Sequence, residues 1–282
     1  MDTKPINPLS KHFRRPEIYF RLPSAGRYWG ENSLDLPVTG EIPIFPMTNA
    51  DEITLKTPDA LINGSAIVNV IQSCCPNITD AWKMPSVDVD ATLIAIRVAS
   101  YGTNMAVTSK CPHCGEEHDY EVDLSKTLEN IKCPDFDRTV DYNGLKIKLR
   151  PQEYFSLTKT NIVQFEEQKI MQTLNSAEID EEVRSVRLKE SMKKLLDLNE
   201  KLLVDSTEYI ETEDGSRVKD PQFIAEYYRN AESKATKVVE DRMSEIAVEG
   251  ALPPSRMNCS SCDQTYEMPL EFDYARFFGT GS

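Results

Sequence analysis

The spacing of apolar residues along this chain changes near residue 104 and again near residue 151. Between residues 48 and 103, apolar positions recur every three or four residues, which is the period of an amphipathic helix. Ser86 belongs to the residue types that cap helix N-termini, and Gly102 suits the end of a helix. This stretch therefore predicts a small helical module.

After residue 103, apolar and polar residues alternate, which is typical of strands with one buried face. Tyr120, Val122 and Leu124 form one such alternation, and residues 265–272 form another. Asn143-Gly144 lies between two further short runs and is a strong signal for a β-hairpin. We expect these parts of the chain to build a β-platform.

A third pattern covers residues 151–254, which are rich in Glu, Lys, Leu and Gln and poor in glycine. One helix is expected over residues 153–174 and a second over residues 177–204, with a break at Asn175 and Ser176. The second helix carries an apolar stripe, which consists of Val183, Val186, Leu188, Met192, Leu195, Leu196 and Leu203. We also expect a hairpin at Asp214-Gly215, a helix after Asp220-Pro221 and a last helix ending near Gly250.

The first 47 residues contain seven prolines, so long helices are excluded there. Residues 18–23 and 41–46 are expected to form extended edge strands. Two interpretations stay open for this segment. It is an extended tail, or it is an arm that docks on a partner through aromatic side chains such as Tyr19, Phe20 and Trp29.

Two Cys-x-x-Cys pairs are the strongest chemical signal in the chain. They are Cys111 with Cys114 and Cys259 with Cys262, and each adjoins an alternating run. Two such pairs supply the four thiolates of a closed tetrahedral zinc site, so we expect a structural Zn²⁺ bound by all four cysteines. Free thiols and an iron–sulfur cluster are the alternatives.

Other residues near the first pair compete less well as ligands. His113 and His118 would need very tight loops to join a site made within residues 111–118, so we interpret them as an exposed turn residue and a strand residue. Cys133 has no neighbouring ligand.

The sequence thus predicts an α+β fold, in which a small helical module is followed by a zinc-ribbon-like β-platform with a long helical insertion. The expected segments are an N-terminal Pro-rich extended arm over 1–47, the helical module over 48–103, the β-platform over 104–150 and 255–282, and the insertion over 151–254.

Charge and motifs narrow the function classes. The chain has 282 residues and a net charge of −14, which repels nucleic-acid backbones. No stretch has the length of a membrane span, and the N-terminus lacks the apolar core of a signal peptide, so we expect a cytosolic protein. No Gly-rich phosphate loop, His-Glu-x-x-His helix or Gly-x-Ser-x-Gly elbow occurs, so an enzyme with a small-molecule substrate is not expected.

Several stretches carry a resemblance to a known family. They are residues 36–48, 51–52, 55–61, 70–74 and 93–97, together with Cys111-Pro112-His113-Cys114. The chain resembles baseplate hub proteins of T-even-type contractile-tailed bacteriophages. The resemblance implies a non-enzymatic hub subunit or hub-assembly factor that contacts other tail proteins in the cytoplasm of the infected bacterium. Whether it stays in the virion is left open.

Two other functions compete with this expectation. A zinc-ribbon protein that binds nucleic acid or regulates transcription would present a basic face, whereas Glu117, Asp119 and Glu121 flank the first cysteine pair. A hydrolase with a catalytic metal would need an open coordination position, which four sulfurs do not leave.

Overall fold

Helices and small sheets share the chain, which confirms the α+β class. The computed structural model describes residues 7–176, 180–270 and 277–278. Its helices are α1 Asn49–Leu55, α2 Pro58–Ile62, α3 Ser65–Cys74, α4 Ser86–Tyr101, α5 Leu124–Asn130, α6 Tyr154–Ser176, α7 Glu181–Asp205, α8 Pro221–Asn230 and α9 Ser233–Glu249. Its strands are β1 Ile18–Phe20, β2 Ile42–Ile44, β3 Asn104–Lys110, β4 Glu117–Asp123, β5 Val140–Tyr142, β6 Leu145–Leu149, β7 Thr207–Glu211, β8 Arg217–Val218, β9 Ser255–Asn258 and β10 Thr265–Met268.

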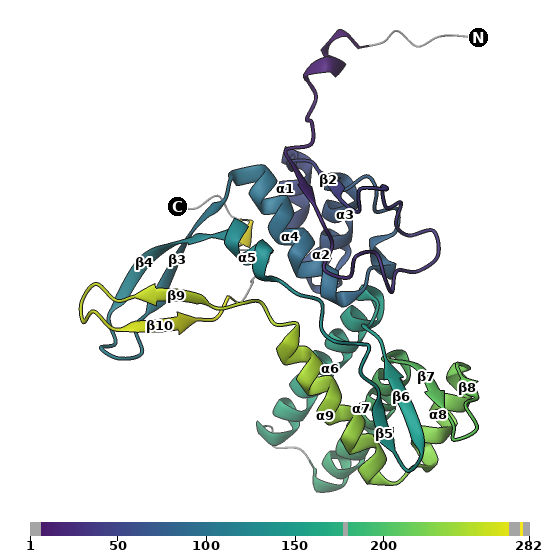
Figure 1. Ribbon diagram of the computed structural model, residues 1–282. Coiled ribbons are helices and arrows are strands. Elements are labelled where there is room, and N and C mark those ends of the chain that lie inside the picture. Colours follow the sequence, from purple (N-terminus) through teal and green to yellow (C-terminus); the bar gives the residue numbers. More distant parts are fainter. Residues whose placement is uncertain (1–6, 177–179, 271–276, 279–282) are drawn as a thin grey trace.

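The first core surrounds α3 and α4 (Figure 1). Local signals set the ends of its helices. Thr48 and Asp51 form a capping box at the start of α1, and Gly102 ends α4 with φ 88°, a region that favours glycine. Eleven residues of α4 are buried, so this helix is the centre of the module.

The N-terminal segment packs on this module. β1 pairs antiparallel with β2, which confirms the two expected strands, and Ile42 and Ile44 are fully buried. Ahead of β1, the Arg14 guanidinium donates hydrogen bonds to the Pro46 and Ser73 carbonyl oxygens at 2.9 and 2.7 Å. Much of the Pro-rich segment therefore contacts the helices of its own chain.

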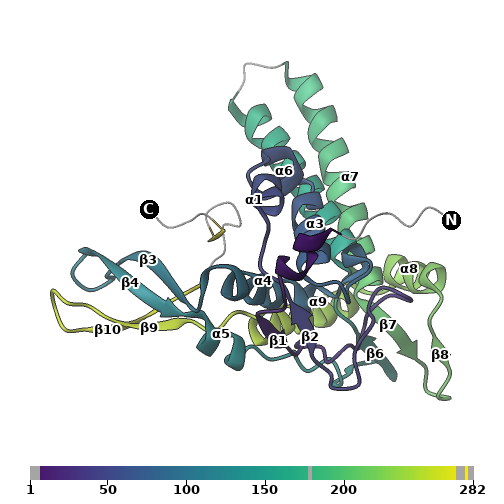
Figure 2. The same ribbon diagram turned by 90° about the horizontal axis from the view of Figure 1, so that it is seen from above.

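Two β-hairpins form a ribbon that projects from the module (Figures 1 and 2). β3 and β4 pair over seven residues each, and β9 and β10 pair over four. The strand alternation was expected to include Leu124, but this residue begins α5, because the Asp123 carboxylate caps the helix by accepting a hydrogen bond from the Ser125 N–H. The far end of the strand expected over 265–272 lies partly outside the described residues.

A second core lies under a four-stranded antiparallel sheet of order β5-β6-β7-β8. Both turn signals are confirmed, since Asn143-Gly144 joins β5 to β6 and Asp214-Gly215 lies between β7 and β8. The sheet unites a hairpin that precedes the insertion with strands inside it, and Ile147 lies opposite Ile210. Whether the four expected segments fold as separate domains stays a prediction.

The helices α6 and α7 form a hairpin that extends away from the rest of the molecule (Figure 2). The break expected at Asn175 and Ser176 is wrong, because α6 continues through Ser176; residues 177–179 lie outside the described part. The expected apolar stripe of α7 is also not buried as one unit. Val183 and Val186 are about half exposed, and Leu196 is 70% exposed, whereas Leu203 is buried.

Candidate metal centre

The two cysteine turns have the same backbone hydrogen bonds. In the first turn, the Cys111 N–H bonds the Glu116 carbonyl and the Gly115 N–H bonds the Cys111 carbonyl, both at 2.9 Å. In the second, the Cys259 N–H bonds the Gln264 carbonyl at 3.0 Å and the Asp263 N–H bonds the Cys259 carbonyl at 2.9 Å. The two turns thus hold their cysteine pairs in equivalent positions at the ends of two hairpins.

Each turn needs a positive φ at its fifth residue. Gly115 supplies it at 80°, and Asp263 adopts 53° at the corresponding position. The positive φ of the aspartate was not anticipated from the sequence. The signal was available, because aspartate tolerates the left-handed region better than most residues with a side chain.

The hairpins bring the four sulfurs together from distant parts of the chain. All four Sγ atoms lie within 4.8 Å of one another. Cys111 Sγ is 3.8 Å from Cys262 Sγ, and Cys114 Sγ is 3.6 Å from Cys259 Sγ. A tetrahedron with metal–sulfur bonds of about 2.3 Å has sulfur–sulfur edges of about 3.8 Å. The spacing therefore fits one metal ion.

Burial differs between the two residues of each pair. Cys111 and Cys259 are buried, while Cys114 is exposed and Cys262 is intermediate. The leading cysteine of each pair thus belongs to the first hydrophobic core, and the trailing cysteine lies toward solvent. A bound ion would consequently lie at the edge of the core.

The thiols of Cys111 and Cys262 have different pKa values. Burial raises the pKa of Cys111, but hydrogen bonds from the backbone N–H groups of Cys114 and His113 outweigh burial and bring it to about 6. The Gln264 N–H lowers the pKa of Cys262, but desolvation and contacts with the other sulfurs raise it to about 12. One thiolate thus forms readily at neutral pH, and a cation at the centre would favour the remaining three.

His118 on β4 contacts the second cysteine turn without joining the sulfur group. Its Nδ1 lies 3.2 Å from Ser260 Oγ and its Nε2 lies 3.0 Å from Ser261 Oγ. Sequence reasoning placed His118 on a strand but missed this contact across the ribbon. Below it, the Tyr120 and Tyr266 rings meet edge to face at 6.3 Å and pack the two hairpins together.

The remaining cysteines lie elsewhere. Cys74 and Cys75 are buried in the first core, as expected, and burial raises the pKa of Cys74 to about 12. Cys133 is half-buried and packs against the second core. In the part of the chain that the structure describes, the four ribbon cysteines form the one group of candidate metal ligands, and neither His113 nor His118 belongs to it.

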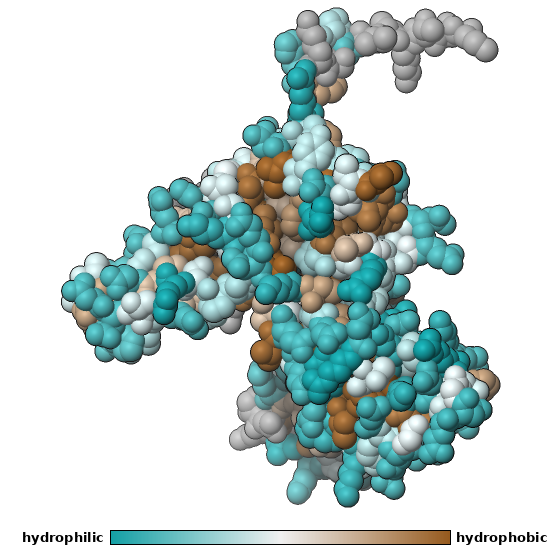
Figure 3. Space-filling model, in the orientation of Figure 1, coloured by the Kyte–Doolittle hydropathy of each residue, from teal (hydrophilic) through white to brown (hydrophobic). Residues whose placement is uncertain are grey.

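The outer face of the ribbon is acidic. Glu117, Asp119 and Glu121 alternate along β4 and are all exposed. Opposite them on β3, Lys110 faces Glu117 and the Thr108 hydroxyl donates to Asp119 at 2.7 Å. The ribbon surface visible in Figure 3 is mainly hydrophilic. This face repels phosphate groups, which argues against nucleic-acid binding by the ribbon.

None of the described helices is both long and apolar enough to cross a bilayer.

The family model described as T4 bacteriophage base plate protein matches residues 30–279. A comparison with curated proteins and one with solved structures gave no match. The family match spans the helical module, both cysteine turns and the whole of the second core, so the chain belongs to the T4 bacteriophage base plate protein family.

Proposed function

We propose that this protein is a baseplate hub subunit or hub-assembly factor, and that its four ribbon cysteines bind one structural zinc ion. Its family supports a structural role in the phage baseplate, in contact with other tail and baseplate proteins. The finer assignment to the hub rests on the resemblance of residues 36–97 and of the first cysteine turn to hub proteins.

The observation that carries the zinc proposal is the convergence of four sulfurs from two hairpins. Four protein ligands leave no position for water or substrate, so the ion would stabilise the ribbon and would not catalyse a reaction. Zinc is favoured over an iron–sulfur cluster because the sulfur–sulfur distances of 3.6 and 3.8 Å match the edges of a mononuclear tetrahedron.

Elemental analysis tests this proposal. Protein purified without chelators is expected to contain about one zinc per chain, as one four-sulfur site requires. Cys133→Ser, which changes a cysteine outside the group, is the matched control and should keep the metal. Carefully purified wild-type protein without metal, or with iron and sulfide in its place, would contradict the zinc proposal.

Co-expression tests the hub proposal. The protein is produced together with each candidate hub and spike protein of the same phage, and complexes are isolated through a tag on the partner. We expect a stable complex with at least one hub component. Failure to assemble with any of them would remove the hub assignment and leave the baseplate role.

Retention in the particle is a separate part of the proposal. We propose that the protein acts in the host cytoplasm during assembly and remains in the tail baseplate. Mass spectrometry of purified virions is expected to detect its peptides, and their absence, with the protein present in infected cells, would identify an assembly factor that leaves.

The competing functions have direct tests. A zinc-ribbon regulator would retain DNA in a filter-binding assay, with affinity that falls as salt rises. A metal-dependent hydrolase would degrade peptidoglycan and lose that activity with chelators. The acidic ribbon face and the complete sulfur set predict a negative result in both assays.

A further inference from the structure

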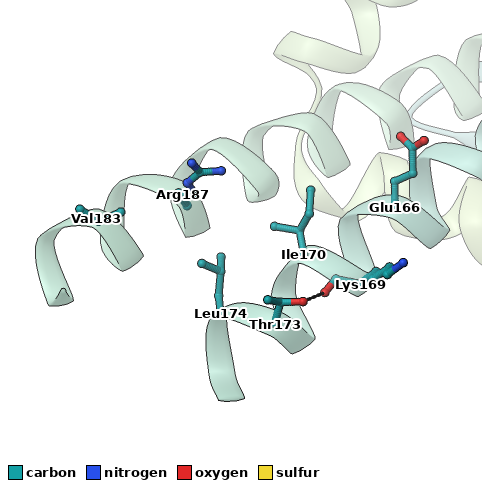
Figure 4. Close-up of a pocket in the computed structure, with 7 residues that line it drawn as sticks. All are labelled: Glu166, Lys169, Ile170, Thr173, Leu174, Val183 and Arg187. Carbon is teal, nitrogen blue, oxygen red and sulfur yellow. Dashed lines mark hydrogen bonds between the residues drawn. The ribbon is translucent and has the colours of Figure 1, made fainter. Parts of the chain in front are cut away.

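A groove lies at the outer end of the α6–α7 hairpin. Ile170 and Leu174 point from α6 toward α7, and Val183 of α7 lines the same groove (Figure 4). Nothing in the described structure specifies what covers it, because its lining mixes apolar side chains with charges of both signs. The interior of the cysteine ribbon is more specific, since two buried hydroxyl groups there have no regular hydrogen bond to another described residue.

Each hairpin of the ribbon has one inner face. In the first hairpin, Val107 of β3 lies opposite Tyr120 of β4, and in the second, Met257 of β9 lies opposite Tyr266 of β10. Opposite residues of antiparallel strands point to the same side, and all four side chains belong to the first core or pack against it. The inner faces therefore pack on each other, with the rings of Tyr120 and Tyr266 in contact.

The strand register places Tyr266 beside Cys259. Tyr266 lies opposite Met257, and Cys259 follows two residues after Met257, so Cys259 is the diagonal neighbour of Tyr266 on the same face. Diagonal neighbours are about 7–8 Å apart, a distance that an aromatic side chain spans. Cys259 is fully buried, and Tyr266 is 9% exposed. Tyr266 and the Cys259 sulfur are therefore neighbours within one buried face.

The hydroxyls of Tyr120 and Tyr266 are both buried. Neither makes a hydrogen bond of regular geometry to another described residue. A desolvated hydroxyl without a partner costs stability, and phenylalanine would make the same ring contact without that cost. Two tyrosines at this contact therefore point to an acceptor that uses their protons.

The surroundings of Tyr120 favour its protonated form. The neighbouring Tyr266 hydroxyl contributes most to a raised Tyr120 pKa, and desolvation and the charges of Cys259 and Cys111 add to it. A phenol with a raised pKa keeps its proton at neutral pH and acts as a donor. In this pair Tyr120 is thus the donor and the Tyr266 oxygen is the acceptor, which leaves the Tyr266 proton for another acceptor.

We propose that Tyr266 is a positioning residue of the metal centre, whose hydroxyl donates a hydrogen bond to the Cys259 sulfur when a cation holds that sulfur as a thiolate. Tyr120 in turn donates to the Tyr266 oxygen. Cys111 accepts backbone N–H groups of its own turn, and Tyr266 supplies Cys259 with a donor from a side chain. Because this role depends on the zinc site proposed above, its test has to separate the two.

Removal of a hydroxyl at constant ring size tests the role of Tyr266. In the full-length protein, Tyr266→Phe is expected to lower the zinc affinity about tenfold, as loss of an outer contact to a metal ligand does. Competition with a chromogenic chelator measures the affinity. Tyr120→Phe should have a smaller effect, since Tyr120 acts through Tyr266. Thr108→Val is the matched control and should keep the wild-type affinity, because the Thr108 hydroxyl lies on the outer face and bonds Asp119.

Two further measurements distinguish a hydrogen bond to sulfur from ring packing. In cobalt-substituted protein, Tyr266→Phe should move the sulfur-to-cobalt charge-transfer band to lower energy, because a hydrogen bond withdraws electron density from the sulfur. In metal-free protein, Tyr266→Phe should be at least as stable to heat as the wild type, since it loses a buried hydroxyl that has no acceptor. The substitution is thus expected to weaken only the metal-loaded state.

The possible failures are distinguishable. A wild-type protein that takes up neither zinc nor cobalt overturns both the zinc proposal and the role of Tyr266. A wild type with one zinc, and a Tyr266→Phe variant with the same affinity and the same cobalt band, overturns the role of Tyr266 alone. An affinity loss with an unchanged band, or a larger effect of Tyr120→Phe than of Tyr266→Phe, also overturns that role.

Discussion

The cysteine ribbon and the α6–α7 hairpin both project from the body of the protein, but different contacts hold them. The ribbon joins two segments whose facing cysteines are 145 and 151 residues apart. The hairpin joins helices whose polar contacts, Glu167 with Ser191 and with Lys194, span 24 and 27 residues. Loop-closure entropy is larger for the ribbon, and a metal ion is the kind of strong contact that offsets it.

The interiors of the two projections also differ. The ribbon has apolar and aromatic contacts beneath its sulfur group, whereas the seam of the hairpin buries the Glu167 carboxylate at 3% exposed side chain. Its Oε2 accepts a hydrogen bond from Ser191 at 2.5 Å, and its Oε1 lies 2.8 Å from Lys194 Nζ. The ribbon would thus depend on the proposed metal ion, while the hairpin depends on complete pairing of one buried charge.

The largest expected effect is the loss of the ribbon. Cys111→Ser or Cys262→Ser should lose about one equivalent of zinc and destabilise the ribbon by several kcal/mol, because metal binding is coupled to folding. Metal content and thermal unfolding measure the two effects. The α6–α7 hairpin should keep its helix content in both variants. A variant with full zinc and an unchanged melting temperature would contradict the assigned ligands.

The next effect concerns the buried carboxylate of the hairpin. Ser191→Ala removes one of its two partners and should destabilise the protein by about 1–3 kcal/mol. Replacing both residues, as Glu167→Leu with Ser191→Leu, should recover or exceed wild-type stability, since an apolar seam needs no desolvated charge. Urea unfolding followed by circular dichroism measures both. Ser185→Ala, at an exposed position of the same helix, is the control. A stable single variant would show that Lys194 alone satisfies Glu167.

Acidification should affect the two projections in sequence. Protons compete with the metal for the thiolates, so the ribbon is expected to release zinc first. The contacts with Lys194 and Ser191 lower the pKa of Glu167 below the ordinary glutamate value of 4.5. Its contribution is therefore complete above pH 4.5 and is lost as the pH falls through the lowered pKa. A zinc indicator and helix dichroism, recorded in one titration, should change in that order; simultaneous transitions would contradict it.

The smallest expected effect is a difference in stability between substitutions at the positive-φ residue of the two cysteine turns. Gly115→Ala should cost about 1 kcal/mol, because an L side chain at φ 80° is strained although nothing crowds its Cβ closer than 3.9 Å. Asp263→Gly places glycine at the corresponding position and should change stability by less than about 1 kcal/mol, because relief of strain is offset by a more flexible unfolded chain. Thermal unfolding of the two variants, compared side by side, measures the difference. If Gly115→Ala and Asp263→Gly lowered the stability equally, the two turns would not be equivalent.

Local signals account for what the sequence predicted correctly. Asn143-Gly144, Asp220-Pro221 and Gly250 each stand where the structure turns or where a helix begins or ends, because turn and cap preferences act within a few residues. The cysteine spacing also predicted which four thiols meet, since thiolates in pairs have a known ligand geometry.

Apart from the cysteine group, features that depend on distant partners were not predicted. The pairing of β6 with β7 joins Ile147 to Ile210, and no local pattern specifies that register. The apolar positions of α7 were identified, but periodicity does not tell which of them α6 covers. Val183 and Leu203 have the same apolar character, but Leu203 is buried in the second core and Val183 is about half exposed.

The layout of the ribbon has a consequence for a chain that a protease cuts between α6 and α7. The two fragments would still be joined by the cysteine group, by the antiparallel pairing of β6 with β7 and by the contacts of Glu167 with Ser191 and Lys194. A nicked chain is therefore expected to migrate as one particle, and a chelator that removed the proposed zinc would weaken only one of these connections. Each of the two segments contributes two of the four clustered cysteines and two strands of the larger sheet.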